Sequence, residues 1–146
     1  MVYLSITRLK LKSPLLLPSF LIHTEWIIHQ IKTSPGFLKG KAIGTINLSM
    51  WTATLWQSEV AMRSFYRSGA HQRVMNYLNA WSSEAAVGHQ VVDIQELPSW
   101  EEAGTRLCQI GYFPRLSQAT WHHCHRIIPH PQFVVIDRSF TPRLNP

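Results

Sequence analysis

The segment from Ala53 to Met75 constrains the fold more than any other part of the chain. As far as Trp56 it alternates threonine with apolar residues, which is typical of a pleated strand. Ser58 then has the side chain of a helix N-cap, and Glu59 places a carboxylate at the positive end of the helix dipole. Ser68-Gly69 predicts a break after which the helix starts again. The segment therefore predicts a strand that runs directly into a helix in two parts.

The remaining residues supply the other elements of an α+β fold. We expect strands over Val2 to Leu11, Phe37 to Ile43, Leu48 to Trp56 and His89 to Leu97, and helices from Pro18 or Ser19 to Ser34, over Glu59 to Arg67 and over Ala70 to Trp81. This order of elements is the split ferredoxin-like plan, in which an antiparallel sheet carries two helices on one face. The capping-box pattern at residues 99–102 predicts an added helix over residues 99–110.

The first and third strands suggest a partner. Val2 to Leu11 and Leu48 to Trp56 carry apolar side chains on both faces, so the face without helices needs a cover. A second copy of the same sheet is the simplest cover, and the sequence therefore predicts a homodimer.

Size and charge restrict the classes of function. The 146 residues, 45% of them hydrophobic, suit one globular domain. The net charge of +6 favours anionic partners only non-specifically, and without a Lys/Arg cluster or a known motif we expect no nucleic-acid binding. Two prolines interrupt the longest apolar run, so we expect no membrane span. Two cysteines, Cys108 and Cys124, do not form a disulfide framework, which favours a reduced, cytoplasmic protein.

Two short motifs add a resemblance to a known family. With this order of elements, the run Leu-Trp-Gln-Ser-Glu at residues 55–59 and the run Arg-Ser-Gly-Ala-His at residues 67–71 resemble the dimeric α/β-barrel proteins of the antibiotic-biosynthesis-monooxygenase (ABM) type. The sequence is most similar to an uncharacterised branch related to spheroidene monooxygenase. The resemblance implies an ABM-like ferredoxin-fold domain at residues 1–116, including the extra helix. The repeated prolines of residues 117–146 predict a C-terminal extension that wraps the domain, with a strand only over Phe133 to Ile136.

The resemblance also implies a set of functions. Members include cofactor-free oxygenases of polyketide-like aromatics, haem-degrading enzymes and proteins without demonstrated activity. The haem-degrading branch uses an asparagine, a tryptophan and a histidine at positions where this chain has Thr7, Phe65 and Met75, so haem degradation of that type is not expected. We expect a small cytoplasmic monooxygenase acting on an apolar aromatic or polyene substrate without a cofactor. The alternatives are a non-catalytic ligand-binding or structural dimer and, as cofactor, the haem of the spheroidene relatives.

His71 is the candidate catalytic residue. It lies beside the Ser68-Gly69 break, where an imidazole can act as a general base or ligate a metal or haem iron. Alternatively, its ring satisfies free backbone groups at the helix start. Tyr66 and Arg67 flank it and can orient a carboxylate or phenolate, although surface placement suits Arg67 equally.

Aromatic and soft side chains predict an apolar pocket between sheet and helices. We expect the pocket to be bounded by Trp51 on the sheet and by Phe65 and His71 on the central helix, with Tyr66, Arg67 and Met75 also contributing. Ordinary core packing is the alternative for these residues.

The histidine-rich run at residues 121–125 is the densest set of metal-capable side chains. A contiguous run cannot close a tetrahedral site by itself, so we expect no resident metal. The alternative pairs His123 with His125, which would point the same way on a strand. The sequence contains no phosphate loop, nucleophile elbow or zinc-protease motif, which disfavours nucleotide-dependent and hydrolase chemistry.

Overall fold

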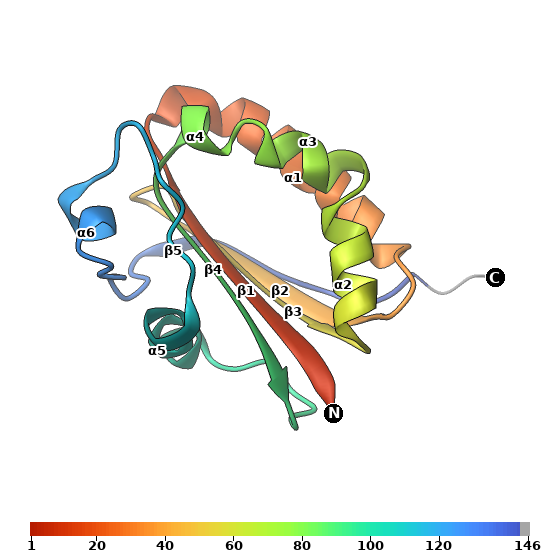
Figure 1. The fold of residues 1–146 in the computed structure, drawn as a ribbon. Coiled ribbons are helices and arrows are strands. Elements are labelled where there is room, and N and C mark those ends of the chain that lie inside the picture. Colours follow the sequence, from red (N-terminus) through yellow and green to blue (C-terminus); the bar gives the residue numbers. More distant parts are fainter. Residues whose placement is uncertain (144–146) are drawn as a thin grey trace.

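A computed structural model describes residues 1–143 as one antiparallel sheet with helices on both faces (Figure 1). The strands are β1 (Val2–Leu11), β2 (Phe37–Thr45), β3 (Ser49–Trp56), β4 (Ser82–Val92) and β5 (Val134–Phe140). The helices are α1 (Leu17–Lys32), preceded by the 3-10 turn η1 (Pro14–Leu16), α2 (Glu59–Tyr66), α3 (Gly69–Met75), α4 (Leu78–Trp81), α5 (Trp100–Ile110) and α6 (Trp121–Cys124). The strand order β4-β1-β3-β2-β5 confirms the predicted α+β, ferredoxin-like class.

The predicted helix starts at α2 and α5 are confirmed. The Ser58 hydroxyl accepts a hydrogen bond from the Ala61 N–H at 3.2 Å, and the Ser99 hydroxyl accepts one from the Glu102 N–H at 3.1 Å. Each cap satisfies a backbone donor that the first turn leaves without a partner. Local sequence therefore determines where both helices begin.

The prediction for the fourth strand is wrong in its position. β4 spans Ser82–Val92, whereas we expected a strand over His89 to Leu97. The predicted helix end at Trp81 is confirmed in α4, although residues 76–77 separate α4 from α3. The run of Ser, Glu and Ala that opens β4 has little intrinsic preference for strand. It becomes a strand because it pairs antiparallel with β1, from Lys10 opposite Glu84 to Val2 opposite Val92.

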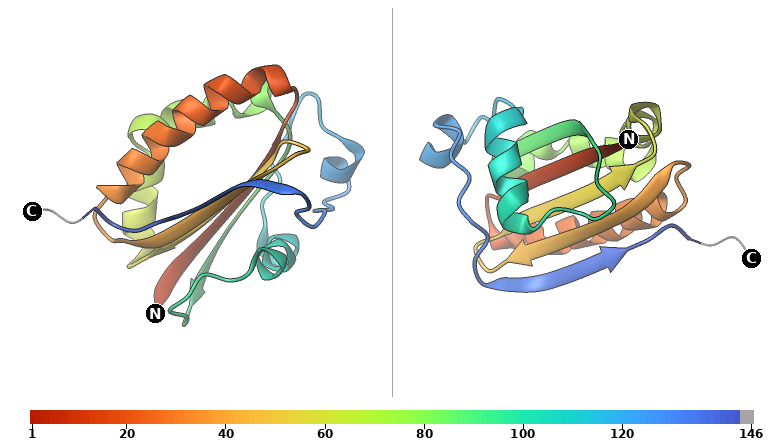
Figure 2. Two further views of the ribbon diagram at one scale, coloured as in Figure 1. Left: turned by 180° about the vertical axis from the view of Figure 1, so that it is seen from behind. Right: turned by 90° about the horizontal axis from the view of Figure 1, so that it is seen from below.

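The two faces of the sheet are covered by different helices (Figure 2). On the face that we call the α1 face, α1, α2, α3 and α4 lie over the strands (Figure 1). On the opposite face, the α5 face, α5 crosses the sheet, and its Ala103 and Leu107 pack against Leu4 and Ile6 of β1 in one buried cluster. Alternation along β1 sends Ser5 and Thr7 to the α1 face.

The cover of the second face differs from the expectation. The premise of the predicted homodimer was a face without helices, but α5 of the same chain covers β1, β3 and β4 there. The added helix was predicted, but its position over the sheet was not, because its amphipathic pattern does not identify the surface that it contacts. The homodimer stays a prediction.

Part of the predicted C-terminal extension belongs to the sheet. β5 pairs with β2, and it is longer than the expected strand over Phe133 to Ile136. Its Phe140 is buried and stacks on Phe37 with ring centroids 5.8 Å apart. Within residues 1–143, no helix is long and apolar enough to cross a membrane.

Candidate ligand-binding site

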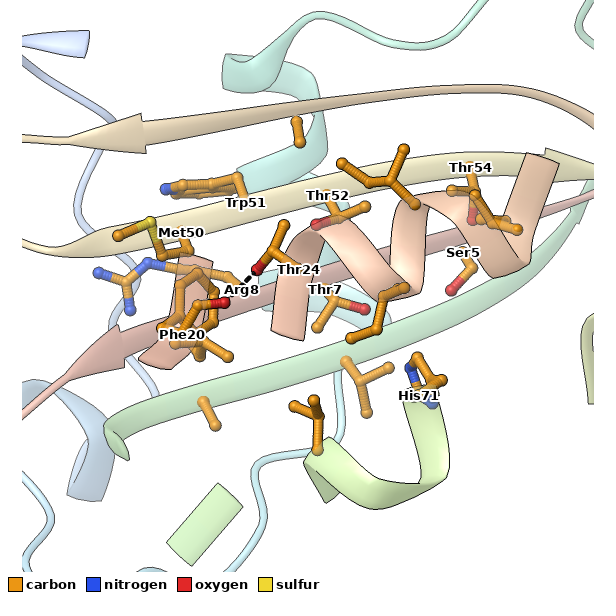
Figure 3. Close-up of a pocket in the computed structure, with 18 of the residues that line it drawn as sticks. Ser5, Thr7, Arg8, Phe20, Thr24, Met50, Trp51, Thr52, Thr54 and His71 are labelled. Carbon is orange, nitrogen blue, oxygen red and sulfur yellow. Dashed lines mark hydrogen bonds between the residues drawn. The ribbon is translucent and has the colours of Figure 1, made fainter. Parts of the chain in front are cut away.

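A cavity of about 460 Å³ lies between the sheet and the helices of the α1 face (Figure 3). Its volume is in the range of small-molecule sites. The apolar part of the wall includes Phe20, Ile27, Ile28 and Ile31 of α1, Val74 and Met75 of α3, Leu78 of α4, and Leu9, Met50 and Ile136 of the sheet. This wall suits an apolar ligand.

Hydroxyl side chains form the centre of the cavity floor. Ser5 lies opposite Thr54 in the strand register, and Thr7 lies opposite Thr52. Figure 3 shows these four side chains close together on β1 and β3. Buried sheet faces are usually filled by Val, Ile and Leu, which carry no hydrogen-bonding groups. The floor therefore offers polar groups in a position where core packing does not require them.

Tyr66, at the end of α2, closes the polar end of the cavity. Its hydroxyl is hydrogen-bonded to the hydroxyl of Ser5, at a partly buried position between helix and sheet. Burial raises the pKa of Tyr66 above its ordinary value, although hydrogen bonds to Ser5 and Thr7 act in the opposite direction. Tyr66 is therefore a neutral phenol at pH 7.

His71 packs directly on Tyr66. The two rings are stacked with centroids 4.3 Å apart, and the Phe65 ring lies 5.0 Å from the imidazole. The His71 Nδ1 lies 3.3 Å from the Tyr66 carbonyl oxygen. A carbonyl oxygen only accepts hydrogen bonds, so Nδ1 carries the proton and Nε2 keeps its lone pair. Nε2 is thus the acceptor of this ring.

Burial sets the charge state of His71. Loss of solvent lowers the pKa of His71 to about 4; the hydrogen bond to the Tyr66 carbonyl opposes this shift, and the charge of His89 adds to it. At pH 7 the imidazole is neutral. This state suits a general base or a hydrogen-bond acceptor.

Gln30 of α1 holds the break between α2 and α3 in place. Its side-chain oxygen accepts a hydrogen bond from the His71 N–H at 3.0 Å, and its amide nitrogen donates to the Ser68 carbonyl at 2.8 Å. Gly69 has φ +59°, and a Cβ there would lie 3.0 Å from the Gln30 amide group. A side chain at Gly69 would therefore disturb the contact that positions His71.

His89 of β4 is the second imidazole at this end. It lies opposite Ser5 in the strand register, and its ring centroid is 5.3 Å from that of Tyr66. Burial lowers the pKa of His89, the Arg63 charge adds to the shift, and Glu59 opposes it. Its Nε2 is buried and has no hydrogen-bond partner among residues 1–143. A buried polar atom without a hydrogen-bond partner lowers the stability of a protein. Such atoms are found at functional sites, where a ligand can supply the missing partner.

The charged side chains that border the cavity are paired. Arg8 borders the cavity from β1, but its guanidinium lies on the α5 face over the Trp51 ring and donates to Glu84 at 2.6 Å. Both side chains are almost completely buried. Arg138 of β5 forms an ion pair with Glu25 of α1. In the part of the chain that the structure describes, no cavity-lining residue carries an unpaired charge.

Four of the six predicted pocket residues line the cavity, and Trp51 and Arg67 differ from them. Phe65, Tyr66, His71 and Met75 line one cavity. Trp51 borders that cavity from the sheet, but its ring lies in the cluster of the α5 face, 6.2 Å from Trp100. Alternation along β3 decides this placement.

Arg67 is an exposed residue outside the cavity lining. Sequence reasoning missed Ser5, Gln30 and His89 as site residues. Alternation along β1 places Ser5 on one face with Thr7, but only the folded structure shows that this face is the cavity floor.

The histidine-rich run forms the short helix α6 and not a strand. The His123 ring is buried: its Nδ1 accepts from the Ala85 N–H at 3.2 Å, and its Nε2 donates to the Pro114 carbonyl at 2.7 Å. Both ring nitrogens are therefore used by the backbone. His125 is exposed and stacks on Trp121. Among residues 1–143, no group of three potential ligands could hold a metal ion.

Comparisons with known proteins give a likeness of fold. No protein-family model matches the sequence, and no curated protein matches it. Rv0793 from Mycobacterium tuberculosis aligns with a TM-score of 0.58 at 10% identity, over 65% of this chain and 98% of its own. SnoaB, a cofactor-independent oxygenase from Streptomyces nogalater, aligns with a TM-score of 0.51 at 16% identity, over 67% and 98%.

A third structure comes from Chloroflexus aurantiacus and is named as a candidate antibiotic biosynthesis monooxygenase. It aligns with a TM-score of 0.53 at 11% identity, over 66% of this chain and 97% of its own. The chain therefore has the fold of the ABM-like proteins, as the sequence motifs predicted. Identities this low show the fold alone.

Proposed function

We propose that this protein binds a flat or extended apolar molecule in the cavity of the α1 face and acts on it as a monooxygenase. The observation that carries the proposal is the cavity itself, whose apolar wall ends at the neutral polar group of Ser5, Tyr66, His71 and His89. The ABM-like fold, which SnoaB and the Chloroflexus aurantiacus protein also have, supports the choice of reaction.

The proposed chemistry depends on the substrate for its electrons. His71 Nε2 takes a proton from an acidic C–H or O–H group of the substrate, because it is the unprotonated nitrogen of a neutral ring. The substrate anion then reduces O₂. For a methylene group the balance is CH₂ + O₂ → C=O + H₂O, with one oxygen atom in the product and the other in water. The apolar wall keeps solvent away from the anion.

Haem is the alternative cofactor, and the site fits it only in part. His71 has the orientation of a ligating histidine, with Nδ1–H bonded to a carbonyl and Nε2 free. However, the arginines at the cavity, Arg8 and Arg138, are already paired with carboxylates and leave no cation for the haem propionates. The cofactor-free reaction therefore needs fewer changes to the site.

A thermal-shift screen tests whether the cavity binds ligands. Flat aromatic and polyene compounds should stabilise the protein by about 2.7 kcal/mol at a hundred times the dissociation constant. Ala42→Leu places a larger side chain in the cavity lining and should abolish the shift. Ala80→Leu, at an exposed position on α4, is the matched control and should keep it. Shifts that survive Ala42→Leu would place the ligand elsewhere.

Oxygen uptake then separates an enzyme from a binding protein. Wild-type protein should consume O₂ when a binding compound is added. His71→Phe should lower the rate of oxygen uptake by about 10²–10⁴-fold, the usual contribution of a general base. Ligand binding without oxygen uptake would support the non-catalytic alternative.

The homodimer is also part of this proposal. Ile46, Phe133 and Val135 remain 64–74% exposed, which gives a second copy an apolar surface near the β5 edge of the sheet. Light scattering at micromolar concentration checks the state, and a monodisperse monomer would exclude the dimer.

A further inference from the structure

We infer that the ligand of this cavity is an uncharged apolar molecule with a hydroxyl group, which donates a hydrogen bond to Nε2 of His71. The inference rests on the proposed function, because it names the chemical class that the same cavity accepts. The expected ligand is a phenol or an enol, and not a carboxylate, a phosphate, an amine or a simple ketone.

The pairing of charges excludes a charged ligand. The cations at the cavity are bound to carboxylates, Arg8 to Glu84 and Arg138 to Glu25. The remaining ionisable groups of the polar end, Tyr66 and the two histidines, are neutral at pH 7. A ligand charge would therefore be buried without a partner, which costs several kcal/mol.

The donor arrangement selects a hydroxyl group. His71 Nδ1 donates to the Tyr66 carbonyl, so Nε2 is an acceptor without a partner among the described residues. The Tyr66 hydroxyl is already bonded to Ser5. A ketone or ether oxygen brings no proton and leaves Nε2 unsatisfied, whereas a hydroxyl group supplies the missing donor.

The position of this acceptor relative to the apolar wall defines the shape of the ligand. His71 enters from α3 beside the floor hydroxyls Ser5 and Thr7 (Figure 3). The apolar residues of α1 and the sheet line the rest of the cavity. The hydroxyl group should therefore sit at one end of a flat hydrocarbon body.

Four probes of one size test the inference by isothermal titration: 2-naphthol, 2-methoxynaphthalene, naphthalene and 2-naphthoate. The hydrogen bond to Nε2 should make 2-naphthol bind about tenfold more tightly than 2-methoxynaphthalene and naphthalene. The carboxylate of 2-naphthoate should make it the weakest ligand.

Two variants assign the preference to one atom. His71→Phe keeps a ring against Tyr66 and Phe65 but removes the acceptor, so the advantage of 2-naphthol should disappear while naphthalene binds as before. His125→Phe is the control: it makes the same substitution at an exposed histidine outside the cavity lining and should keep the preference. The ¹⁵N resonance of His71 Nε2 in wild-type protein gives a readout that needs no variant, and it should shift with 2-naphthol and not with 2-methoxynaphthalene.

The outcomes separate this inference from the proposed function. Equal affinities for the three uncharged probes, or tightest binding of 2-naphthoate, would overturn the inference and leave the cavity as a binding site. A preference that persists in His71→Phe would overturn the assignment to Nε2. No binding of any probe, with no shift in the thermal screen, would overturn both.

Discussion

The two faces of the sheet bury different kinds of side chain. On the α5 face, Leu4, Ile6, Trp51 and Leu107 form a continuous apolar core. The Trp51 ring also packs over Gly104, where an added Cβ would be in ordinary van der Waals contact at 3.4 Å. On the α1 face, the same strands present hydroxyl groups and a cavity. Close packing maximises stability, so the space and the polar groups of the α1 face are features that packing alone does not require.

The charged groups differ between the faces in the same way. The Arg8–Glu84 pair of the α5 face is closed, because both partners are buried and Thr120 donates a further hydrogen bond to Glu84 at 2.7 Å. The imidazoles of the α1 face, His71 and His89, each keep a nitrogen without a protein partner in the described chain. The α5 face thus pairs its buried charges within the chain, although Arg8 Nε and Trp51 Nε1 have no partner among residues 1–143. The free imidazole nitrogens of the α1 face belong to residues that line a cavity.

The largest expected effect comes from breaking the ion pair of the α5 face. Arg8→Met leaves the Glu84 carboxylate buried without its cation, which should lower the free energy of unfolding by about 3–5 kcal/mol. Urea denaturation at pH 7 measures this change. The double variant Arg8→Met/Glu84→Gln removes the buried charge and should recover at least half of the loss. A single variant within about 1 kcal/mol of wild type would contradict a closed pair.

A smaller effect should appear on the α1 face when the pH falls. The pKa of His71 is about 4 in the folded protein against an ordinary 6.5, so the unfolded chain binds more protons between these values. Stability is therefore fully present above pH 6.5 and decreases as the pH falls toward 4, by about 2 kcal/mol between pH 7 and pH 5 for His71 alone.

Comparison with His71→Phe isolates this contribution. Denaturation of the variant at both pH values should show a loss smaller by that amount, with His89 responsible for part of the remainder because burial also lowers its pKa. The stability contribution of the α5 face changes at lower pH than that of the α1 face. Burial tends to raise the pKa of Glu84, but hydrogen bonds from Thr120 and Arg8 and nearby positive charges lower it below 4.5. Its contribution is lost only below pH 4.5. Equal pH dependence in wild type and variant would contradict a neutral buried His71.

The smallest expected effect distinguishes the two faces by one hydroxyl group. Thr52→Val on the cavity floor keeps the side-chain shape and should change stability by less than about 1 kcal/mol. Ala53→Ser, at the next residue, points to the α5 face, where Ala53 is completely buried. Ala53→Ser should lower the free energy of unfolding by about 1–3 kcal/mol, because the added hydroxyl group would be buried without a hydrogen-bond partner. Thermal denaturation measures both, and equal costs would remove the distinction between the faces.

Local signals in the sequence predicted the elements that depend on neighbouring residues. The caps at Ser58 and Ser99 and the break at Ser68-Gly69 all occur in the structure, because each depends on backbone groups within one helical turn. The start of β4 was not predictable in this way. Ser82–Val92 is a strand because β1 offers a partner along its whole length, and pairing between distant segments outweighs weak local preference.

The candidate site shows the same division. His71, Tyr66 and Phe65 could be proposed from the sequence because they share one short helical segment. Ser5 and His89 could not, since 84 positions along the chain separate two residues that lie opposite each other in the β1–β4 register.

The amino-acid sequence by itself determined the element order, the ferredoxin-like class and the two-part helix that carries His71. Only the tertiary structure decided that α5 closes one face and that the other keeps a cavity with Ser5, Tyr66, His71 and His89 at its end. The physical reason is the range of the interactions. Caps and side-chain periodicity act within a few residues, whereas strand pairing and the burial of a sheet face depend on segments that meet only when the chain has folded.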